Sequence, residues 1–346
     1  MKVHRIAPDA VVDRLAGMVL CHDAGSNGVR LRKGHVLRLE DLSVLRASAW
    51  TEMHVIEIEH GDLHEDEAGR RLATASAGDG VVPHTPSAGH WPLLATRRGV
   101  LDVSVDALRH ANLIDGICIY TLFHGQIVDV GEHVARAKVA PLVLEERLIG
   151  EAESLLAGTS GALRVRPFHP RRIGAVAAET LGRTAADRIR ATLAEKIAWF
   201  GSTMLEPAFV APSEDALLGA ISDLIGDGAE VLLVAGTKPM DPLDASWLAL
   251  RQFGVTIERF GVPAHPGSLF WIAWHGDIPI LGVPTCGLFT QASVFDLILP
   301  RILAGERIGR AELAELGHGG FLTRELGFRF PPYRGGGSVR GEVEDE

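Results

Sequence analysis

The chain has 346 residues, with 34 Lys and Arg against 44 Asp and Glu, which gives a formal net charge of −10. Hydrophobic residues at 47% and charged residues at 23% are ordinary values for a globular protein and exclude wholesale disorder. The acidic balance argues against a protein that binds the phosphate backbone of nucleic acids, but it leaves room for one small anionic ligand in a local basic pocket.

The sequence predicts a cytoplasmic protein with no membrane-spanning segment. Cys21, Cys118 and Cys286 are far apart and form no CxxC pair, which excludes a zinc ribbon and a disulfide framework and indicates a reducing compartment. Asp9 and Asp13 interrupt the apolar run that a signal peptide needs. No segment approaches the roughly 18 apolar residues of a membrane-spanning helix.

Short strand-like runs and short helices alternate in the first half of the chain. We expect strands at residues 18–22, 55–59, 99–103, 117–122 and 134–139, and helices at 39–47, 62–75 and 141–157. The segment 78–92, rich in Gly, Pro, Ser and His, is expected to form one long loop. This texture predicts a mixed, largely antiparallel α+β domain, rich in strands, that covers residues 1–157 and ends at the breaker sequence AGTSG.

The second half of the chain alternates strands with helices. We expect strands at residues 173–178, 207–211, 230–235, 255–260 and 278–283, and helices at 185–200, 213–225, 243–252 and 290–303. The run EVLLVA has no polar alternation, which is typical of a strand buried on both faces of a parallel sheet. Ser213 is expected to be the N-cap of the helix at 213–225. These features predict an α/β domain with a doubly wound, mostly parallel sheet at residues 158–334, followed by a disordered acidic tail at 335–346.

Ligands of open α/β sheets bind outside the carboxyl ends of the strands. The loop AGTKPMDPLD follows the most apolar strand, and Gly236, Thr237 and Lys238 offer a close backbone approach, a hydroxyl and a positive charge for a phosphate. Asp241 and Asp244 add two carboxylates that suit a hydroxyl, an amine or Mg²⁺. The structural alternative makes Asp241 the N-cap of the next helix and places Asp244 in its first turn.

Two further loops at this edge are candidates for binding a ligand. The turn VPAHPGS offers Pro266, Gly267 and Ser268, although a purely structural turn is its simpler interpretation. The loop PTCGLFT joins the last strand to the last helix, and its small and hydroxyl residues suit an anion at a helix N-terminus; the candidates are Thr285, Cys286, Gly287 and Thr290. Cys286 has no recognisable basic partner, so a buried small residue is a simpler role for it than a nucleophile.

Several motif classes are absent from the sequence. The loop AETLGRT, which contains Thr180, matches neither GxGxxG nor GxxxxGK[ST], so neither a Rossmann dinucleotide site nor a P-loop is expected. The 15 His residues form no HExxH motif. His60 and His64 lie four residues apart in HGDLHEDE, but Asp62 and Glu65 predict a helix start with a capping box there rather than a metal site.

In their order and spacing, these segments resemble the molybdopterin-binding proteins related to molybdopterin molybdenumtransferase, the MoeA type that also forms the C-terminal domain of gephyrin. The motifs that carry the resemblance are AGTKPMDPLD, GVPAHPGS, GVPTCGLFTQASVFDLILPRILAG and the closing GHGGFL. Residues 16–47, 61–69 and 132–144 look like the linker and central domains of that family, so the resemblance covers about residues 15–330. It is clearest for a shorter subgroup that lacks the extra C-terminal barrel.

The resemblance implies a MogA-like α/β domain that binds molybdopterin, or its nucleotide form, through its phosphate at the carboxyl edge of the sheet. Full-length members insert molybdate into adenylylated molybdopterin with Mg²⁺ and work as homodimers. By this resemblance Asp241 and Asp244 are the candidate catalytic residues, with Asp241 near the metal or the phosphates. The segment 285–290 is expected near the pterin or its phosphate, and Thr180 joins the cofactor-binding set.

Only five Lys occur in this Arg-rich chain, and Lys33, Lys138 and Lys238 all lie inside motif-like segments. Because Arg does not replace Lys chemically, this favours specific roles for them. Lys238 is expected to neutralise a phosphate, and Lys138 to reach the α/β site of a partner subunit. Surface lysines placed there by chance remain the alternative.

The chain departs from the molybdenumtransferase pattern at three loops. The family's Gly-Gly-x-Ser, Thr-Gly-Asp-Glu and Pro-Gly-Asn-Pro stand where this chain has AGTK, AETL and PTCG. Three hypotheses therefore stay open. The preferred one is a molybdopterin-binding, molybdenumtransferase-like protein; the others are a non-catalytic carrier that delivers finished cofactor to a client molybdoenzyme, and a nucleotide hydrolase with the same fold.

Overall fold

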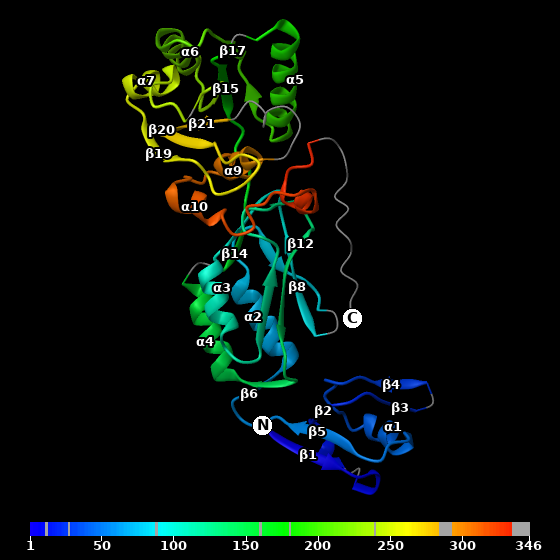
Figure 1. The fold of residues 1–346 in the computed structure, drawn as a ribbon. Helices are drawn as coiled ribbons and strands as arrows, with labels where there is room; N and C mark the ends of the chain where they lie inside the picture. The colour runs from blue at the N-terminus through cyan, green and yellow to red at the C-terminus, as the bar shows by residue number, and fades with distance from the viewer. Residues whose placement is uncertain are drawn as a thin grey trace.

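The computed structural model describes residues 1–10, 13–26, 28–86, 89–158, 161–179, 181–238, 240–283 and 293–333 of the chain (Figure 1). It is a mixed α/β structure with several sheets. Its buried apolar side chains form separate clusters in the N-terminal, central and C-terminal parts of the chain. None of the helices in these ranges is long and apolar enough to cross a membrane.

The N-terminal part is a small antiparallel sheet with one short helix. Its elements are β1 (Lys2–Ile6), η1 (Pro8–Ala10), η2 (Asp13–Leu15), β2 (Val19–Leu20), β3 (Ala24–Ser26), β4 (Val29–Leu31), α1 (Asp41–Ala47) and β5 (Met53–Glu57). The strand order is β1–β5–β2, and β3 and β4 form a hairpin. Leu20, Leu42, Leu45 and Val55 are buried in its own apolar core.

Among the described residues, the central part contains three antiparallel sheets, one of them with only two strands, and three helices. Its strands are β6 (Asp62–His64), β7 (Val81–Pro83), β8 (His90–Ala95), β9 (Gly99–Val103), β10 (Ile117–Thr121), β11 (Ile127–Val128), β12 (His133–Val139), β13 (Val143–Glu145) and β14 (Leu163–Arg166); its helices are α2 (Glu65–Ser76), α3 (Val105–Asn112) and α4 (Glu146–Ala157). One sheet has the order β10–β12–β8–β7 and the other β11–β9–β14, while β6 pairs with β13. The three helices lie on one side of β8 and β12, where their apolar faces are buried (Figure 1).

Three sequence-based expectations for this part are wrong. The helix expected at 141–157 begins only at Glu146, because residues 143–145 form β13, which pairs with β6. The segment 78–92 is not one loop, because it contains β7 and the start of β8. Helix α2 begins at Glu65 rather than at Asp62, since Asp62 belongs to β6, which pairs with β13. The N-cap is His64, whose Nδ1 accepts a hydrogen bond from the backbone of Asp66 at 3.3 Å, so the expected Asp62–Glu65 capping box does not form.

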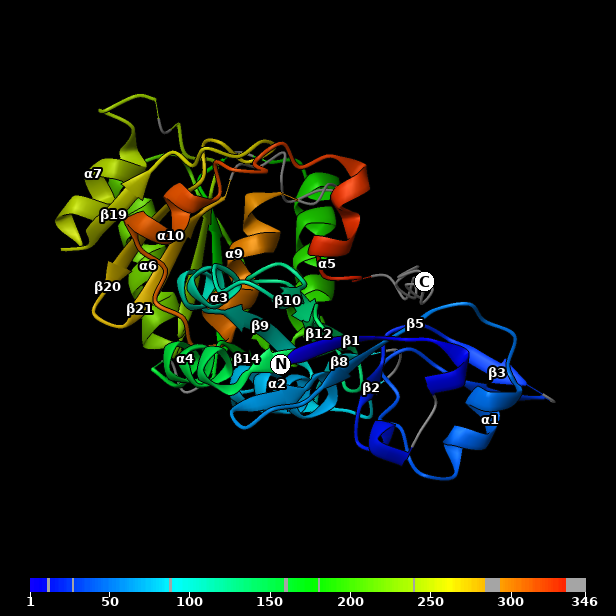
Figure 2. The same ribbon diagram turned by 90° about the horizontal axis from the view of Figure 1, so that it is seen from below.

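The C-terminal part is a three-layer structure around one mixed sheet. Its strands are β15 (Arg172–Ala177), β16 (Thr203–Met204), β17 (Ala208–Phe209), β18 (Val231–Ala235), β19 (Thr256–Phe260), β20 (Trp271–His275) and β21 (Ile278–Gly282). Its helices are α5 (Arg183–Trp199), α6 (Glu214–Gly226), α7 (Ala245–Gln252), α9 (Val294–Leu303), α10 (Arg310–Glu315) and η3 (Arg324–Arg329). Helices α5 and α9 cover one face of the sheet, and α6 and α7 the other (Figure 2).

The sheet has the order β16–β15–β18–β21–β20–β19, with β17 also alongside β15. Strand β18 lies between β15 and β21 and pairs with both in parallel. Strand β20, in contrast, runs antiparallel to both β21 and β19. The sequence did not predict β20, and this reversed strand is what makes the sheet mixed. The hairpin from β20 to β21 closes over only two residues, Gly276 and Asp277.

The central and C-terminal parts pack against each other through specific contacts. Ile127 of β11 belongs to the apolar cluster of the C-terminal sheet. The Arg98 guanidinium stacks 3.7 Å above the ring of Trp199 at the end of α5. The backbone of His169, just before β15, donates a hydrogen bond to Leu303 O at the end of α9. Because β15 begins soon after His169, this hydrogen bond places the C-terminus of α9 at the amino edge of the sheet.

Candidate functional site

Several loops meet at the carboxyl edge of the C-terminal sheet. The strands β15, β18 and β21 all end at this edge because they are parallel. Since β20 is reversed, the connection 261–270 between β19 and β20 reaches the same edge. This edge faces upward in Figure 2. Ligands of α/β sheets bind at such an edge, and the topology brings two of the selected loops to it, the loop after β18 and the connection 261–270. The third selected loop, PTCGLFT, lies outside the described residues.

The loop after β18 touches the loop after β15. Gly236 has a positive φ of 75°, and a Cβ there would lie 2.5 Å from Cγ of Glu179 and 3.0 Å from the backbone of Ala178, so only glycine fits. The half-buried Thr237 accepts a 3.5 Å hydrogen bond at Oγ1 from Nε1 of Trp271. Lys238 is exposed and forms no ion pair with any residue of the described ranges, so its ammonium is available to an anion.

The two candidate carboxylates both bond to backbone amides at the start of α7. Asp241 Oδ1 accepts from the amide of Leu243 at 2.9 Å, and Asp244 Oδ1 accepts from the amide of Ser246 at 3.0 Å. The N-cap of α7 is therefore Asp244, and the alternative with Asp241 as N-cap is wrong because the helix begins later, at Ala245. Each carboxylate has a second oxygen outside these bonds. Asp241 is exposed and Asp244 half-buried, so both can bond the backbone and contact a ligand.

The connection 261–270 packs against the start of α9. The Pro266 carbonyl accepts a hydrogen bond from the amide of Val294 at 3.2 Å, and the His265–Pro266 peptide bond is cis. Gly267 has φ 115°, and a Cβ there would lie 2.8 Å from Cβ of Val294. The hydroxyl-bearing Ser268 is exposed. Helix contact therefore fixes this turn and leaves Ser268 facing solvent.

Two segments that carry the family resemblance lie side by side. The amide of His265 donates to Gly320 O at 2.7 Å, and the amide of Leu322 donates to His265 O at 2.8 Å. The closing GHGGFL segment thus supports the GVPAHPGS turn, although more than 50 residues separate them in sequence.

The remaining candidates fall into two groups. Lys138 is in the central part, on β12, where its Nζ lies 3.5 Å from Nε2 of His90; it therefore belongs to a different sheet from the loops above. The other candidates lie outside the described residues: Thr180, Thr285, Cys286, Gly287 and Thr290.

A buried polar cluster in this part of the chain was not predicted from the sequence. Lys196 on α5 forms a 2.7 Å ion pair with Asp296 on α9, and Tyr333 Oη donates to the same carboxylate at 2.8 Å. Asp296 also accepts a hydrogen bond from the amide of Ser293, which closes a capping box at the start of α9. Burial raises the pKa of Tyr333, and the neighbouring Asp296 adds to the rise.

The signal for this cluster is present in the sequence. Lys196 lies between Leu193 and Ile197 on the apolar face of α5, and all three are buried. A lysine in that position requires a buried partner.

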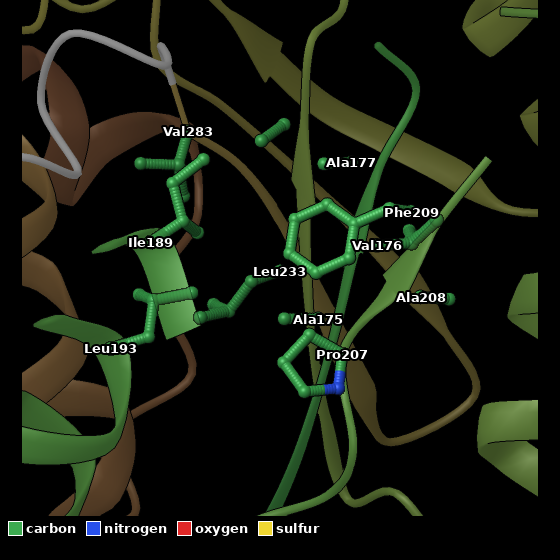
Figure 3. A pocket seen from close by; sticks show the side chains of 11 residues that line it. Ala175, Val176, Ala177, Ile189, Leu193, Pro207, Ala208, Phe209, Leu233 and Val283 are labelled. Carbon is green, nitrogen blue, oxygen red and sulfur yellow. The ribbon is translucent and has the colours of Figure 1, made fainter. Parts of the chain in front are cut away.

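A small cavity under the edge is apolar and lies between α5 and the strands β15, β17 and β18 (Figure 3). Its volume is about 10 Å³, and its walls include Ile189, Leu193, Phe209 and Leu233. Ligand pockets for molecules of pterin size are far larger, at roughly 300–1,000 Å³. This cavity is therefore a packing gap and not the ligand site.

No three His, Cys, Asp or Glu side chains converge as metal ligands in the part of the chain that the structure describes. His64, one of the two histidines in HGDLHEDE, instead forms a 2.7 Å hydrogen bond between its Nε2 and the carbonyl oxygen of Gly34. Mg²⁺ is often held by only one or two carboxylates together with substrate phosphates. The exposed Asp241 fits that role, since one of its carboxylate oxygens has no backbone partner.

Comparisons with known proteins add little. No protein-family model matches the chain, and no curated protein matches its sequence. Among solved structures, a molybdopterin biosynthesis MoeA protein from Pyrococcus horikosii is similar at 12% identity, covering 70% of this chain and 74% of that one, with a TM-score of 0.30. A NadC deletion mutant is similar at 11% identity, covering 54% and 79%, with a TM-score of 0.17. Superpositions this loose do not establish the fold or the function.

Proposed function

We propose that the chain is a molybdopterin-binding protein that acts in the biosynthesis or maturation of the molybdenum cofactor. One observation carries the proposal. The segments that resemble the molybdenumtransferase family, AGTKPMDPLD and GVPAHPGS, lie at one edge of an α/β sheet, and GHGGFL is hydrogen-bonded to the second of them. This is the edge at which such sheets bind ligands. The proposed domain is the MogA-like α/β unit predicted at residues 158–334; within that range β14 pairs with β9 of the central part, and the α/β sheet itself begins at β15.

In this proposal, residues from two loops bind a phosphate-bearing pterin. Lys238, which forms no ion pair within the described ranges, supplies a positive charge, and the backbone at Gly236 can approach a phosphate closely because that residue has no side chain. Thr237 and Ser268 supply hydroxyls from two different loops. Asp241 and Asp244 are the candidate catalytic residues, and Asp241 would hold Mg²⁺, which neutralises phosphate charge when bound. Thr180 and the segment 285–290 complete the proposed set.

Binding is the first test, because it does not presuppose catalysis. Purified protein is titrated with molybdopterin while the fluorescence of the pterin is followed. Lys238→Ala is expected to weaken binding by about tenfold, the usual scale of one lost charge-assisted hydrogen bond. Lys2→Ala is the matched control, since Lys2 is exposed and already paired with Glu59 at 2.7 Å. If the protein binds no pterin, the proposal is wrong.

A non-catalytic carrier is the second candidate, and one observation favours it. Asp241 and Asp244 both bond to backbone amides at the start of α7, so both have structural roles that a protein without catalysis would also need. The Asp241→Asn variant separates the two functions. For an enzyme, it lowers molybdate- or nucleotide-dependent turnover far more than binding. For a carrier, the wild-type protein binds the cofactor tightly and shows no turnover at all.

A further inference from the structure

A small polar cavity lies at the junction of the central and C-terminal parts. It has a volume of about 20 Å³ and is lined by His124, Gly125, Gln126, Leu297, Arg301, Leu316 and Arg329. These residues come from the loop between β10 and β11, from α9, from the end of α10 and from η3. Arg301 is near the C-terminus of α9 and therefore at the amino edge of the sheet. The cavity is thus separate from the loops to which the proposed function is assigned.

One wall of the cavity has an acceptor without a donor. Gln126 is only 2% exposed, and its Oε1 has no hydrogen-bond partner among the residues that the structure describes. Buried amide oxygens are nearly always paired, because desolvation without a replacement bond is unfavourable. A ligand in this cavity therefore has to offer a hydrogen to Gln126.

A second wall has a positive charge without a counterion. Arg329 is half-buried, and burial lowers the pKa of its guanidinium. It stacks 5.2 Å from the ring of Phe123 and reaches Gly319 O at 3.5 Å, but no carboxylate of the described ranges pairs with it. Arg301, by contrast, is held by Glu306 through two hydrogen bonds. Within the described part of the chain, the cavity therefore carries one positive charge that no carboxylate neutralises.

His124 adds a donor rather than a further charge. Its Nδ1 accepts from the backbone amide of Val103 at 3.2 Å, so the neutral ring carries its proton on Nε2. Burial lowers the pKa of His124, and the nearby Arg301 adds to the fall. Asp102 Oδ1 lies 3.6 Å from the same nitrogen, but its carboxylate is bound by Arg164 and Arg166.

We propose that this cavity binds one hydrogenphosphate group. Water would satisfy Gln126 but not Arg329, and chloride would satisfy Arg329 but not Gln126. A singly protonated phosphate does both, since its hydroxyl donates to Gln126 while its charged oxygens accept from Arg329 and His124. The cavity has room for about one water-sized oxygen, so the hydroxyl oxygen occupies it and the other oxygens lie toward half-exposed Arg329. The bound anion joins the loop that contains His124 and Gln126 to η3.

The source of the phosphate can be distinguished by its protonation. At pH 8 inorganic phosphate still carries one hydrogen, whereas a phosphate monoester, with a second pKa of about 6, carries none. The melting temperature of the full chain is measured at pH 8 with inorganic phosphate, methyl phosphate or chloride at equal ionic strength. Methyl phosphate is chosen because it has no other hydroxyl that could donate. Inorganic phosphate is expected to raise the melting temperature progressively with concentration. The other two salts are expected to raise it much less. An equal rise with methyl phosphate would assign the site to phosphate esters and would overturn the role given to Gln126.

Three variants test the residues. Arg329→Gln is expected to weaken the phosphate response by at least about tenfold. Arg324→Gln, an exposed arginine on the same 3-10 helix, is the matched control and keeps the response. Gln126→Glu puts a carboxylate beside Arg329 and is expected to abolish the response. Broadening of the ³¹P resonance of inorganic phosphate by each variant reports binding independently of melting. The proposal is overturned if chloride acts as strongly as phosphate, if phosphate has no effect, or if Arg329→Gln responds like the wild type.

Discussion

The ammonium of Lys196 lies 2.7 Å from the carboxylate of Asp296, and both side chains are buried in the C-terminal core. The pair joins α5 to α9, and the same carboxylate accepts hydrogen bonds from Tyr333 and from the backbone of Ser293. Removing one charge of a buried pair leaves the other uncompensated, which is far more destabilising than breaking an exposed pair.

Lys196→Met is therefore expected to lower the free energy of unfolding by about 3–5 kcal/mol. The measurement is urea denaturation followed by tryptophan fluorescence. Glu206→Gln, which breaks the exposed pair between Arg190 and Glu206 in the same part of the chain, is the control and should lower it by less than about 1 kcal/mol. Similar small losses in the two variants would contradict the prediction, because they would show that removing Lys196 does not leave Asp296 as a costly buried charge.

A second prediction concerns two glutamates on helix α2. The Glu65 carboxylate is packed between Gly34 and Gly89. A Cβ added to either glycine would contact one of the two carboxylate oxygens. Burial raises the pKa of Glu65, although His64, Lys138 and Lys33 oppose the rise. Arg70 lowers the pKa of Glu67 through a direct hydrogen bond. The two residues should therefore make opposite contributions to the pH dependence of stability.

The folded state binds the Glu65 proton more tightly than the unfolded state does. Stability from this group is therefore lost as the pH rises from the ordinary glutamate range, about 4.3, through the raised pKa of the folded state. Glu65→Gln is expected to raise the free energy of unfolding at pH 7 and to flatten its fall with pH. Glu67→Gln should lower it slightly at pH 7, by less than about 1 kcal/mol. Denaturant titrations between pH 4 and about pH 8 measure both. A loss of stability in Glu65→Gln at pH 7 would contradict the prediction.

A third prediction compares two glycines. Gly282, at the end of β21, faces the fully buried Trp271 on β20, and a Cβ there would overlap the indole ring. Gly282→Ala is expected to lower the free energy of unfolding by at least about 1–3 kcal/mol. Gly150 lies inside α4, and a Cβ added there would meet no atom within 4 Å outside the local helix backbone. Gly150→Ala should therefore raise the free energy of unfolding by about 0.5–1 kcal/mol. Thermal melts of the two variants should shift in opposite directions.

A fourth prediction separates the capping role of Asp244 from its proposed role with the ligand. Asp244→Ala removes the hydrogen bond to Ser246 and should lower the free energy of unfolding by about 1 kcal/mol. Asp244→Ser keeps a capping oxygen and should leave stability near that of the wild type. If Asp244 acts on the ligand, Asp244→Ser still loses molybdopterin-dependent activity. A fully active Asp244→Ser variant would assign the residue to the helix alone.

Local chemistry made several elements predictable from sequence. Ser213 was expected to cap a helix, and its hydroxyl does accept a hydrogen bond from the amide of Ala216. The strand expected at 99–103 has those bounds in the structure. In both cases residue types that are adjacent in the sequence are enough for the prediction, either a capping side chain or β-branched apolar residues beside a turn.

Where long-range contacts decide, the sequence predictions were wrong or incomplete. Pairing with β13 converts Asp62 from a helix cap into a strand residue. The strand Trp271–His275 begins three residues after a Pro-Gly turn, and its two tryptophans are stabilised by neighbours in the sheet that sequence spacing cannot show. For the candidate site, the sequence identified the loops but not their geometry. The buried partner of Lys196 lies 100 residues away, and the cavity at Gln126 is formed by segments from both halves of the chain.

The reversed strand β20 also has a practical consequence for engineering the protein. Its hairpin to β21 turns over Gly276 and Asp277, and the Asp277 side chain is fully exposed. This turn lies at the amino edge of the sheet, opposite the loops that carry the candidate ligand site. Exposed tight turns of small and polar residues tolerate insertions. A fluorescent protein or affinity tag fused between these two residues would report on the molecule from the side remote from that site.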